Sequence, residues 1–283
     1  MARSPYLAEI LRLDPLRDHK RIVHLHVCYE FPFDTTRSLE FALFRTFAVP
    51  TIAKLLDSTG EFAGRAQKRY DDTDILISAM LEHGYDSEVG TRALRRMNQI
   101  HGRFEIANDD FRYVLSTFVF EPIRWNARFG WRPMTENEKL ALFHCWREIA
   151  HRMAIEEIPE DFAEFERFNV EYERDRFQST AAGRRVAGAT RAMFLAWFPG
   201  LPGRLGEQVI AAMLDDPILD AFGFRHPSPQ LRRAVAAAMR ARSRGIRLLP
   251  SRRRPRLRTE MRRRTYGRSY ELESLGPPPP GRS

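Results

Sequence analysis

The sequence lacks the residues and segments that mark several large classes of protein. It has two cysteines in 283 residues, Cys28 and Cys145, which excludes a disulfide-stabilised scaffold and is typical of a reducing compartment. No apolar run reaches about 20 residues and no apolar signal core follows the N-terminus, so we expect neither a transmembrane span nor a secretory signal. Glycine-rich phosphate loops, HExxH, paired CxxC motifs and the GxSxG turn are also absent. These absences predict a cytoplasmic protein outside the common nucleotide-binding, zinc-dependent and serine-hydrolase classes.

Positive charge is concentrated at one end of the chain. The sequence carries 46 Lys and Arg against 37 Asp and Glu, a net charge of +9. The last 44 residues hold 14 arginines and three glutamates, so residues 1–239 carry a net charge of −2. The body therefore has no overall signature of specific nucleic-acid binding. The tail has the charge for weak contact with a membrane surface, although a solubilising extension explains it equally well.

Helical signals dominate as far as Leu249. Helix caps recur, and no Val/Ile/Thr alternation persists long enough to form a sheet. We predict an all-α fold in one domain, residues 1–249, and an Arg/Pro-rich tail, residues 250–283, that is disordered or lies along the surface, because it is too poor in apolar residues to fold alone. The predicted helices cover residues 16–29, 34–47, 61–83, 87–101, 108–120, 135–153, 159–177, 180–198, 206–214 and 229–243, and any helix passing Pro122 must kink or restart.

The predicted helix 87–101 carries a histidine on its apolar face. At 100° per residue, Leu94, Met97 and His101 share one stripe, while the arginines of this helix lie largely off it. A neutral imidazole in an apolar wall is what an axial ligand of haem iron requires. The alternative is a core histidine that is hydrogen-bonded to a backbone carbonyl.

The predicted helix 61–83 carries two polar residues within its apolar stripe, Arg69 and Thr73. A buried arginine must be paired, because an isolated buried charge is very costly, and a haem propionate, a bound anion or an internal carboxylate would pair it. Thr73 has a hydroxyl that can donate to bound oxygen. The alternative is an arginine that reaches the surface and a threonine that bonds back to its own helix. The remaining members of the stripe are Phe62, Ala66, Leu76, Ile77 and Met80.

Two further patterns compete for a functional role. Glu148 and His151 form a Glu-x-x-His pair of the kind used in di-iron carboxylate bundles, although such bundles need a second copy and the sequence has none. Phe41, Phe44 and Phe47 recur at helical spacing and are candidates for the wall of a large apolar pocket, or for an ordinary core.

Several short motifs, in this order and spacing, resemble the MpaB / latex clearing protein family, which contains the rubber oxygenase catalytic domain. The resemblance covers roughly residues 20–250. The motifs are Tyr29–Asp34, Ala48–Pro50, Thr59–Phe62, Arg69-x₃-Thr73, Arg96–Gly102 and Trp146–Glu148.

The resemblance implies an all-α protein with a globin-like core around haem b, which uses O₂ to cleave a carbon–carbon double bond in an apolar isoprenoid-like substrate. His101 matches the axial ligand of the iron, with Met97 beside it in the haem pocket. Arg69 and Thr73 match the arginine and threonine on the opposite side. Where some members place a lysine before this threonine, the chain has Asp72, with Lys68 nearby. A haem-binding sensor or carrier without turnover and a di-iron bundle are the alternatives.

Overall fold

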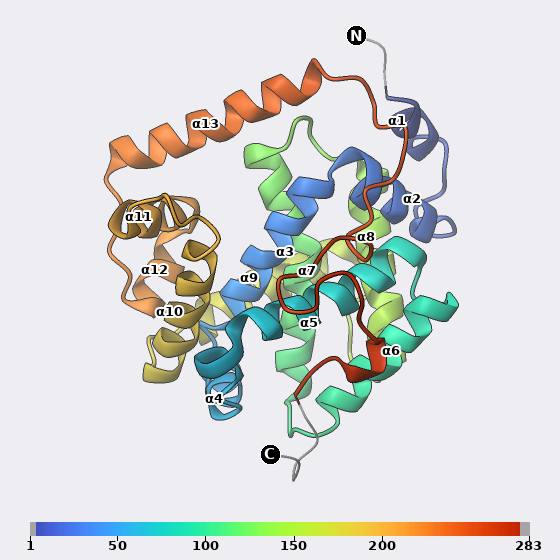
Figure 1. Cartoon of the computed structure of the whole chain (residues 1–283). Coiled ribbons are helices and arrows are strands. Elements are labelled where there is room, and N and C mark those ends of the chain that lie inside the picture. The colour runs from blue at the N-terminus through green and yellow to red at the C-terminus, as the bar shows by residue number, and fades with distance from the viewer. Residues whose placement is uncertain (1–3, 278–283) are drawn as a thin grey trace.

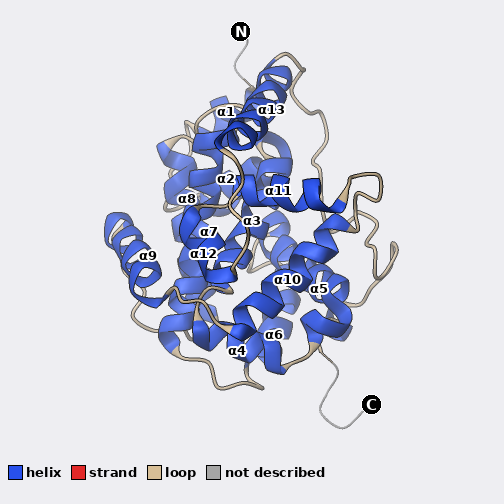
Figure 2. Cartoon of the chain, turned by 90° about the vertical axis from the view of Figure 1, so that its left-hand side faces the viewer, coloured by secondary structure: helices blue, strands red, loops and turns tan. Residues whose placement is uncertain are grey.

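The computed structural model describes residues 4–277, and it is helical throughout. Thirteen α-helices, one π-helical turn and one 3₁₀ turn make up the regular structure of this range, with a single isolated bridge between Arg263 and Gly267 in place of any strand (Figure 2). The prediction of an all-α fold is confirmed. None of the helices in the described range is long and apolar enough to cross a membrane.

The helices form a bundle of crossing pairs in which α3 packs along α7, α5 along α6 and α2 along α8 (Figure 1). The helix α13 lies across one end of this bundle. The bounds are α1 Pro5–Ile10, α2 His19–Leu25, α3 Pro32–Thr46, α4 Pro50–Ser58, α5 Glu61–His83, α6 Glu88–His101, α7 Asn108–Phe129, α8 Glu136–Arg152, α9 Phe162–Arg176, α10 Ala181–Leu195, α11 Gly203–Met213, α12 Asp216–Phe222 and α13 Pro229–Arg247, with the π-turn η1 at His26–Glu30 and the 3₁₀ turn η2 at Leu272–Ser274.

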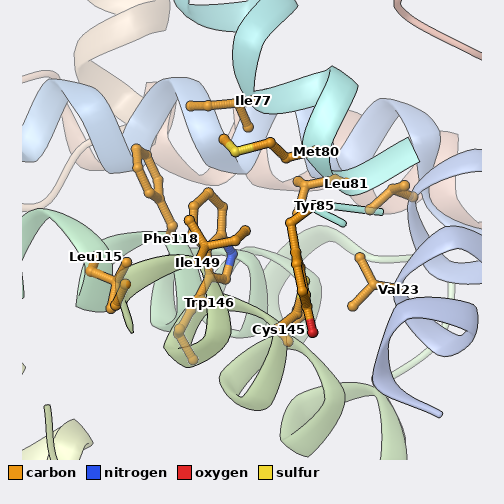
Figure 3. Close-up of a cluster of buried hydrophobic side chains, with 14 of the residues drawn as sticks. Val23, Ile77, Met80, Leu81, Tyr85, Leu115, Phe118, Cys145, Trp146 and Ile149 are labelled. Atoms are coloured by element: carbon orange, nitrogen blue, oxygen red, sulfur yellow. The ribbon is translucent and has the colours of Figure 1, made fainter. Parts of the chain in front are cut away.

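The main core lies where α2, α5, α7 and α8 meet (Figure 3). Met80 of α5 is fully buried there, and Phe118 of α7 stacks on Trp146 of α8 with ring centroids 4.7 Å apart. Burying such large apolar side chains contributes about 1.5–3 kcal/mol each. This core holds one end of α5 rigidly, which matters because the other end of the same helix carries the site described below.

Several predicted helix boundaries were wrong. The helix expected at 34–47 begins at Pro32, and the prediction missed α1, α4 and α12. The helix α7 continues through Pro122 to Phe129 as one helix, so it does not restart after the proline. The predicted helix 61–83 has the right bounds but bends at Arg65, whose φ of −142° and ψ of 41° leave the helical region.

The sequence left open whether the tail is disordered or lies along the surface. In the structure residues 250–277 follow a defined course over the body, and residues 278–283 lie outside the described range. After α13 the chain runs back over the bundle and crosses α5 and α6 (Figure 1). Polar partners hold it there together with a few apolar side chains: Arg258 and Arg263 both bind the Asp74 carboxylate, Glu82 accepts bonds from the backbone N–H groups of Arg258 and Thr259, and the side chains of Leu272 and Leu275 are buried. We call residues 256–277 the C-terminal strap.

Deleting the strap should destabilise the body. A chain ending at Leu249 leaves the buried carboxylates of Asp71, Asp72 and Glu82 without their hydrogen bonds from the strap, and each buried acceptor left unsatisfied costs about 1–3 kcal/mol. We expect the chain ending at Leu249 to melt at a clearly lower temperature than the full chain, as measured by circular dichroism. A chain ending at Pro277, which retains every one of these contacts, is the control. Equal melting temperatures for all three would show that the strap contributes nothing to stability.

Candidate functional site

A cavity of about 370 Å³ lies between α3, α4, α5, α6, α7 and α10. All four residues singled out in the sequence line it: Arg69 and Thr73 from α5, and Met97 and His101 from α6. Helical periodicity therefore identified one face of α5 and one face of α6, and the fold turns both faces toward this cavity.

The walls of the cavity are mainly aromatic and aliphatic. Seven phenylalanines contribute to it, together with leucine and isoleucine from α4, α5 and α6. Phe44 and Phe47 are among them, as expected, but Phe41 is not, because its ring packs on Trp125 instead with centroids 5.3 Å apart. Such a surface suits an apolar ligand of small-molecule size. The phenylalanines are Phe44, Phe47, Phe62, Phe104, Phe111, Phe118 and Phe194.

Two glycines set the angle at which α6 leaves α5. Gly84 ends α5 with φ of +87°, a conformation that other residues rarely adopt. A Cβ on Gly90 would collide with the backbone of Gly84 and Tyr85, so only glycine lets the first turn of α6 pack on this corner. Ser87 caps α6 by accepting a hydrogen bond from the Gly90 N–H at 3.0 Å. The tight corner brings α6 alongside α5 and so places His101 on the cavity shared with Arg69.

The stripe predicted on α5 is largely confirmed as a cavity wall. Phe62, Ala66, Leu76 and Ile77 line the cavity with Arg69 and Thr73, whereas Met80 belongs to the core between α5, α7 and α8. The bend at Arg65 lies between Phe62 and Arg69.

The imidazole of His101 is held without a hydrogen bond at Nδ1. This nitrogen is out of reach of solvent and has no partner in the described part of the chain, and the ring packs on Phe111 with centroids 5.3 Å apart. The sequence left open a second interpretation, in which His101 is a core histidine that is hydrogen-bonded to a backbone carbonyl. The fold shows no such bond at Nδ1. Burial, reinforced by the positive charge of Arg69, lowers the pKa of His101 to about 4. At neutral pH the ring is uncharged, so one of its two ring nitrogens carries the lone pair that a metal ligand needs.

Arg69 points its charge at the cavity rather than reaching the surface. It forms no ion pair with any carboxylate between residues 4 and 277, and burial lowers the pKa of its guanidinium. Its Nη1 donates to Thr73 Oγ1, and its guanidinium lies 5.8 Å from the ring centroid of Phe62. Since a guanidinium has five N–H donors, most of them are left for a ligand.

Thr73 bonds back to its own helix, as one of the two interpretations predicted. Its hydroxyl donates to the Arg69 carbonyl at 3.0 Å while accepting from the Arg69 guanidinium. The single hydroxyl proton is thus already used. Thr73 therefore orients Arg69, and Arg69 is the donor that faces the cavity.

The sequence did not reveal other polar groups that line the cavity, among them Glu40 of α3. Burial raises the pKa of Glu40 to about 7, and its Oε1 accepts from the Tyr70 hydroxyl at 2.5 Å and pairs with Arg37 at 2.6 Å. A signal was present, because Glu40 lies four and seven residues before Phe44 and Phe47, on the same helical face.

Lys68 and Asp72 bond to each other beside the cavity. Lys68 Nζ donates to Asp72 Oδ2 at 2.7 Å and to the carbonyl of Gly276 in the strap at 2.8 Å. The Asp72 carboxylate also accepts from the Tyr266 hydroxyl of the strap. The lysine therefore ties the strap to α5 and does not line the cavity.

The Glu-x-x-His pair lies away from the cavity. Glu148 is half-exposed and paired with Arg152 at 2.6 Å, and His151 is exposed. Within residues 4–277, no three His, Cys, Asp or Glu side chains are grouped so that they could hold a metal ion. The geometry of a di-iron carboxylate site is therefore not present in this range.

Comparisons of the chain with a family model and with individual known proteins point to the same family. A family described as "ER-bound oxygenase mpaB/B'/Rubber oxygenase, catalytic domain" matches residues 41–244. The chain is 30% identical over 211 residues to ER-bound oxygenase mpaB of Penicillium roqueforti (strain FM164), covering 68% of this chain and 71% of that protein. It is 29% identical over 218 residues to ER-bound oxygenase mpaB' of Penicillium brevicompactum, covering 71% of this chain and 52% of that protein. The chain therefore belongs to the family of ER-bound oxygenases mpaB/B' and rubber oxygenases.

Proposed function

We propose that this oxygenase binds haem b in the cavity and uses O₂ to cleave or oxidise a carbon–carbon double bond of an apolar, isoprenoid-like substrate. One observation carries the proposal: a neutral imidazole and an unpaired guanidinium, on two different helices, line one apolar cavity. Membership of an oxygenase family supports the reaction class, and the aromatic walls support the substrate class.

The residues present fit a haem. His101 has the chemistry of an axial ligand, because it is neutral at pH 7 and one ring nitrogen is left without a hydrogen bond. Met97, one turn earlier on the same face of α6, would pack against the macrocycle. Arg69 offers an unpaired cation to an anionic or polar group of the bound cofactor, oxygen or substrate. The apolar walls would shield the macrocycle from water.

The protein would position the cofactor and the substrate, exclude water and supply one charged hydrogen-bond donor. Haem b, when bound, supplies the oxidative chemistry with O₂. His101 would hold the cofactor from α6. Arg69, oriented by Thr73, would donate hydrogen bonds into a cavity whose low polarity strengthens them. The phenylalanines would seat the alkene and keep water out.

Replacing the proposed ligand should remove the cofactor and leave the fold. We expect His101→Ala to lose the Soret band while keeping its far-ultraviolet circular dichroism, because the ring makes no hydrogen bond at Nδ1 on which packing depends. His151→Ala, on the exposed surface of α8, is the matched control and should keep a full complement of haem. A His101→Ala protein that retains stoichiometric haem after purification would exclude His101 as the ligand.

Substitutions at Arg69 and Thr73 should lower the cleavage rate to different extents. Removing a donor aimed at developing charge costs about 2.7–4 kcal/mol, so Arg69→Ala should lower single-turnover cleavage about a hundredfold to a thousandfold at equal haem content. Thr73→Val removes one orienting hydrogen bond and should lower the rate about tenfold. Thr73→Ser, which keeps the hydroxyl, should restore most of the rate.

Arg65→Ala on the same helix is the control, because this arginine is half-exposed and outside the cavity. The two sites should also be coupled, so that the double variant Arg69→Ala/Thr73→Val is no slower than Arg69→Ala alone. Wild-type rates in both single variants would overturn the role of this pair. Haem binding without any turnover in the wild type would favour the carrier alternative.

We propose that any contact with a membrane is made by the end of α13 rather than by the strap. Leu248 and Leu249 are 80% and 67% exposed, and they lie among exposed arginines that include Arg244 and Arg247, whereas Arg258 and Arg263 of the strap are engaged with Asp74. An exposed apolar pair flanked by cations suits an anionic lipid surface. We expect co-sedimentation with vesicles containing phosphatidylserine, weakened by Leu248→Ser/Leu249→Ser. Equal recovery of both proteins would refute this contact.

A further inference from the structure

The strap is fastened to one side of α5 by carboxylates. Thr265 N–H donates to Asp71 Oδ2 at 2.8 Å, the Tyr266 hydroxyl donates to Asp72, and Thr259 Oγ1 donates to Glu82 Oε2 at 2.7 Å. Further along, the side chains of Leu272 and Leu275 are buried against the body. These contacts fix the course of the strap as far as the rim of the cavity.

The tip of the strap forms part of the cavity wall. Gly276 and Pro277 line the cavity with Ile100 and His101 of α6. Gly276 has φ of +89°, and a Cβ added to it would lie 2.5 Å from Cδ1 of Ile100. The backbone of the strap therefore lies against the Ile100 side chain of the helix that carries the proposed ligand, in a conformation that favours glycine.

The tip is held differently from the rest of the strap. Its described ties are bonds from side-chain cations to backbone carbonyls: Lys68 Nζ donates to Gly276 O at 2.8 Å and Arg103 Nη1 donates to Pro277 O at 2.9 Å, while Arg96 Nε and Nη2 hold the carbonyl just before the tip, Leu275 O, at 2.7 and 2.5 Å. None belongs to a helix or sheet ladder. Gly276 and Pro277 can therefore leave the cavity without breaking any backbone bond of α5 or α6 and without exposing the buried Leu275 side chain.

From these contacts we propose that the strap tip, residues Gly276 and Pro277, is a movable wall that controls entry to the cavity and limits the length of the apolar substrate, while the buried Leu275 side chain keeps the rest of the strap in place. With the tip in place, Gly276 and Pro277 close the space beside His101; with the tip displaced, the cavity opens at that point and admits a longer chain. The tip lies beyond residues 41–244, the range matched by the catalytic-domain family. The identity of the ligand as an alkene rests on the proposed function, whereas control of entry does not.

The test compares two adjacent arginines of α6 in the full-length protein. Arg96→Ala removes both bonds to Leu275 O, whereas Arg95→Ala changes an exposed arginine outside the cavity. Nile red, an apolar fluorescent probe, is mixed rapidly with each protein and its entry is followed by fluorescence. We expect entry roughly tenfold faster in Arg96→Ala than in wild type, because charge-assisted bonds that hold the tip are lost, and unchanged entry in Arg95→Ala. A chain ending at Ser274 lacks the tip altogether and should show the same acceleration even if Arg96→Ala folds poorly.

A second measurement separates this inference from the proposed function. Cleavage of a short and a long isoprenoid alkene is compared in haem-normalised proteins, and the ratio of long to short should rise in Arg96→Ala and in the chain ending at Ser274. Wild-type entry rates for Nile red in both variants would overturn the movable wall, whatever the activity. Faster entry without cleavage of either alkene would support the wall and refute the proposed reaction. Faster entry with an unchanged long-to-short ratio would refute the length limit.

Discussion

The site depends on a positive charge buried beside a neutral imidazole. An unpaired guanidinium in an apolar wall costs several kcal/mol, so the rest of the fold must hold Arg69 where it lies. Its charge adds to burial in lowering the pKa of His101, so the same interaction that destabilises the empty cavity keeps the imidazole unprotonated. A fold that gives up stability at one place in this way is typical of a functional site.

The framework that maintains this arrangement is packed into the core at one end and bent at the other. The C-terminal half of α5 lies in the core with α7 and α8, and Gly84 and Gly90 fix the corner that returns the chain along α6. The N-terminal turn of α5 bends at Arg65 instead of continuing straight. Phe62 precedes this bend and lines the cavity with Arg69 and Thr73, so the bend sets where its ring lies relative to them.

Local periodicity was enough to find four residues of the site, because they form two pairs and each pair lies within one helix. Arg69 and Thr73 are four residues apart, as are Met97 and His101, and helical spacing alone placed each pair on one face. The roles assigned to them remain proposals. Glu40 shares a helical face with Phe44 and Phe47, but its bond with Tyr70 forms only between α3 and α5 in the folded chain, and no local pattern encodes that contact. Short helices such as α4 and α12 were missed because nine and seven residues give too few apolar repeats to detect.

The course of the tail was not predictable from the sequence for a related reason: besides the buried Leu272 and Leu275, many of its contacts are polar pairs between residues far apart in the chain. Its arginines, tyrosines and backbone amides bind carboxylates of α5 that lie about 180–195 residues earlier, and composition cannot pair groups so far apart. This pairing also explains why Arg69 is unpaired. Asp72, three residues after Arg69, would be its nearest partner along the helix, but its carboxylate is bound by Lys68 and Tyr266. By occupying this carboxylate, the strap leaves the guanidinium of Arg69 free to face the cavity.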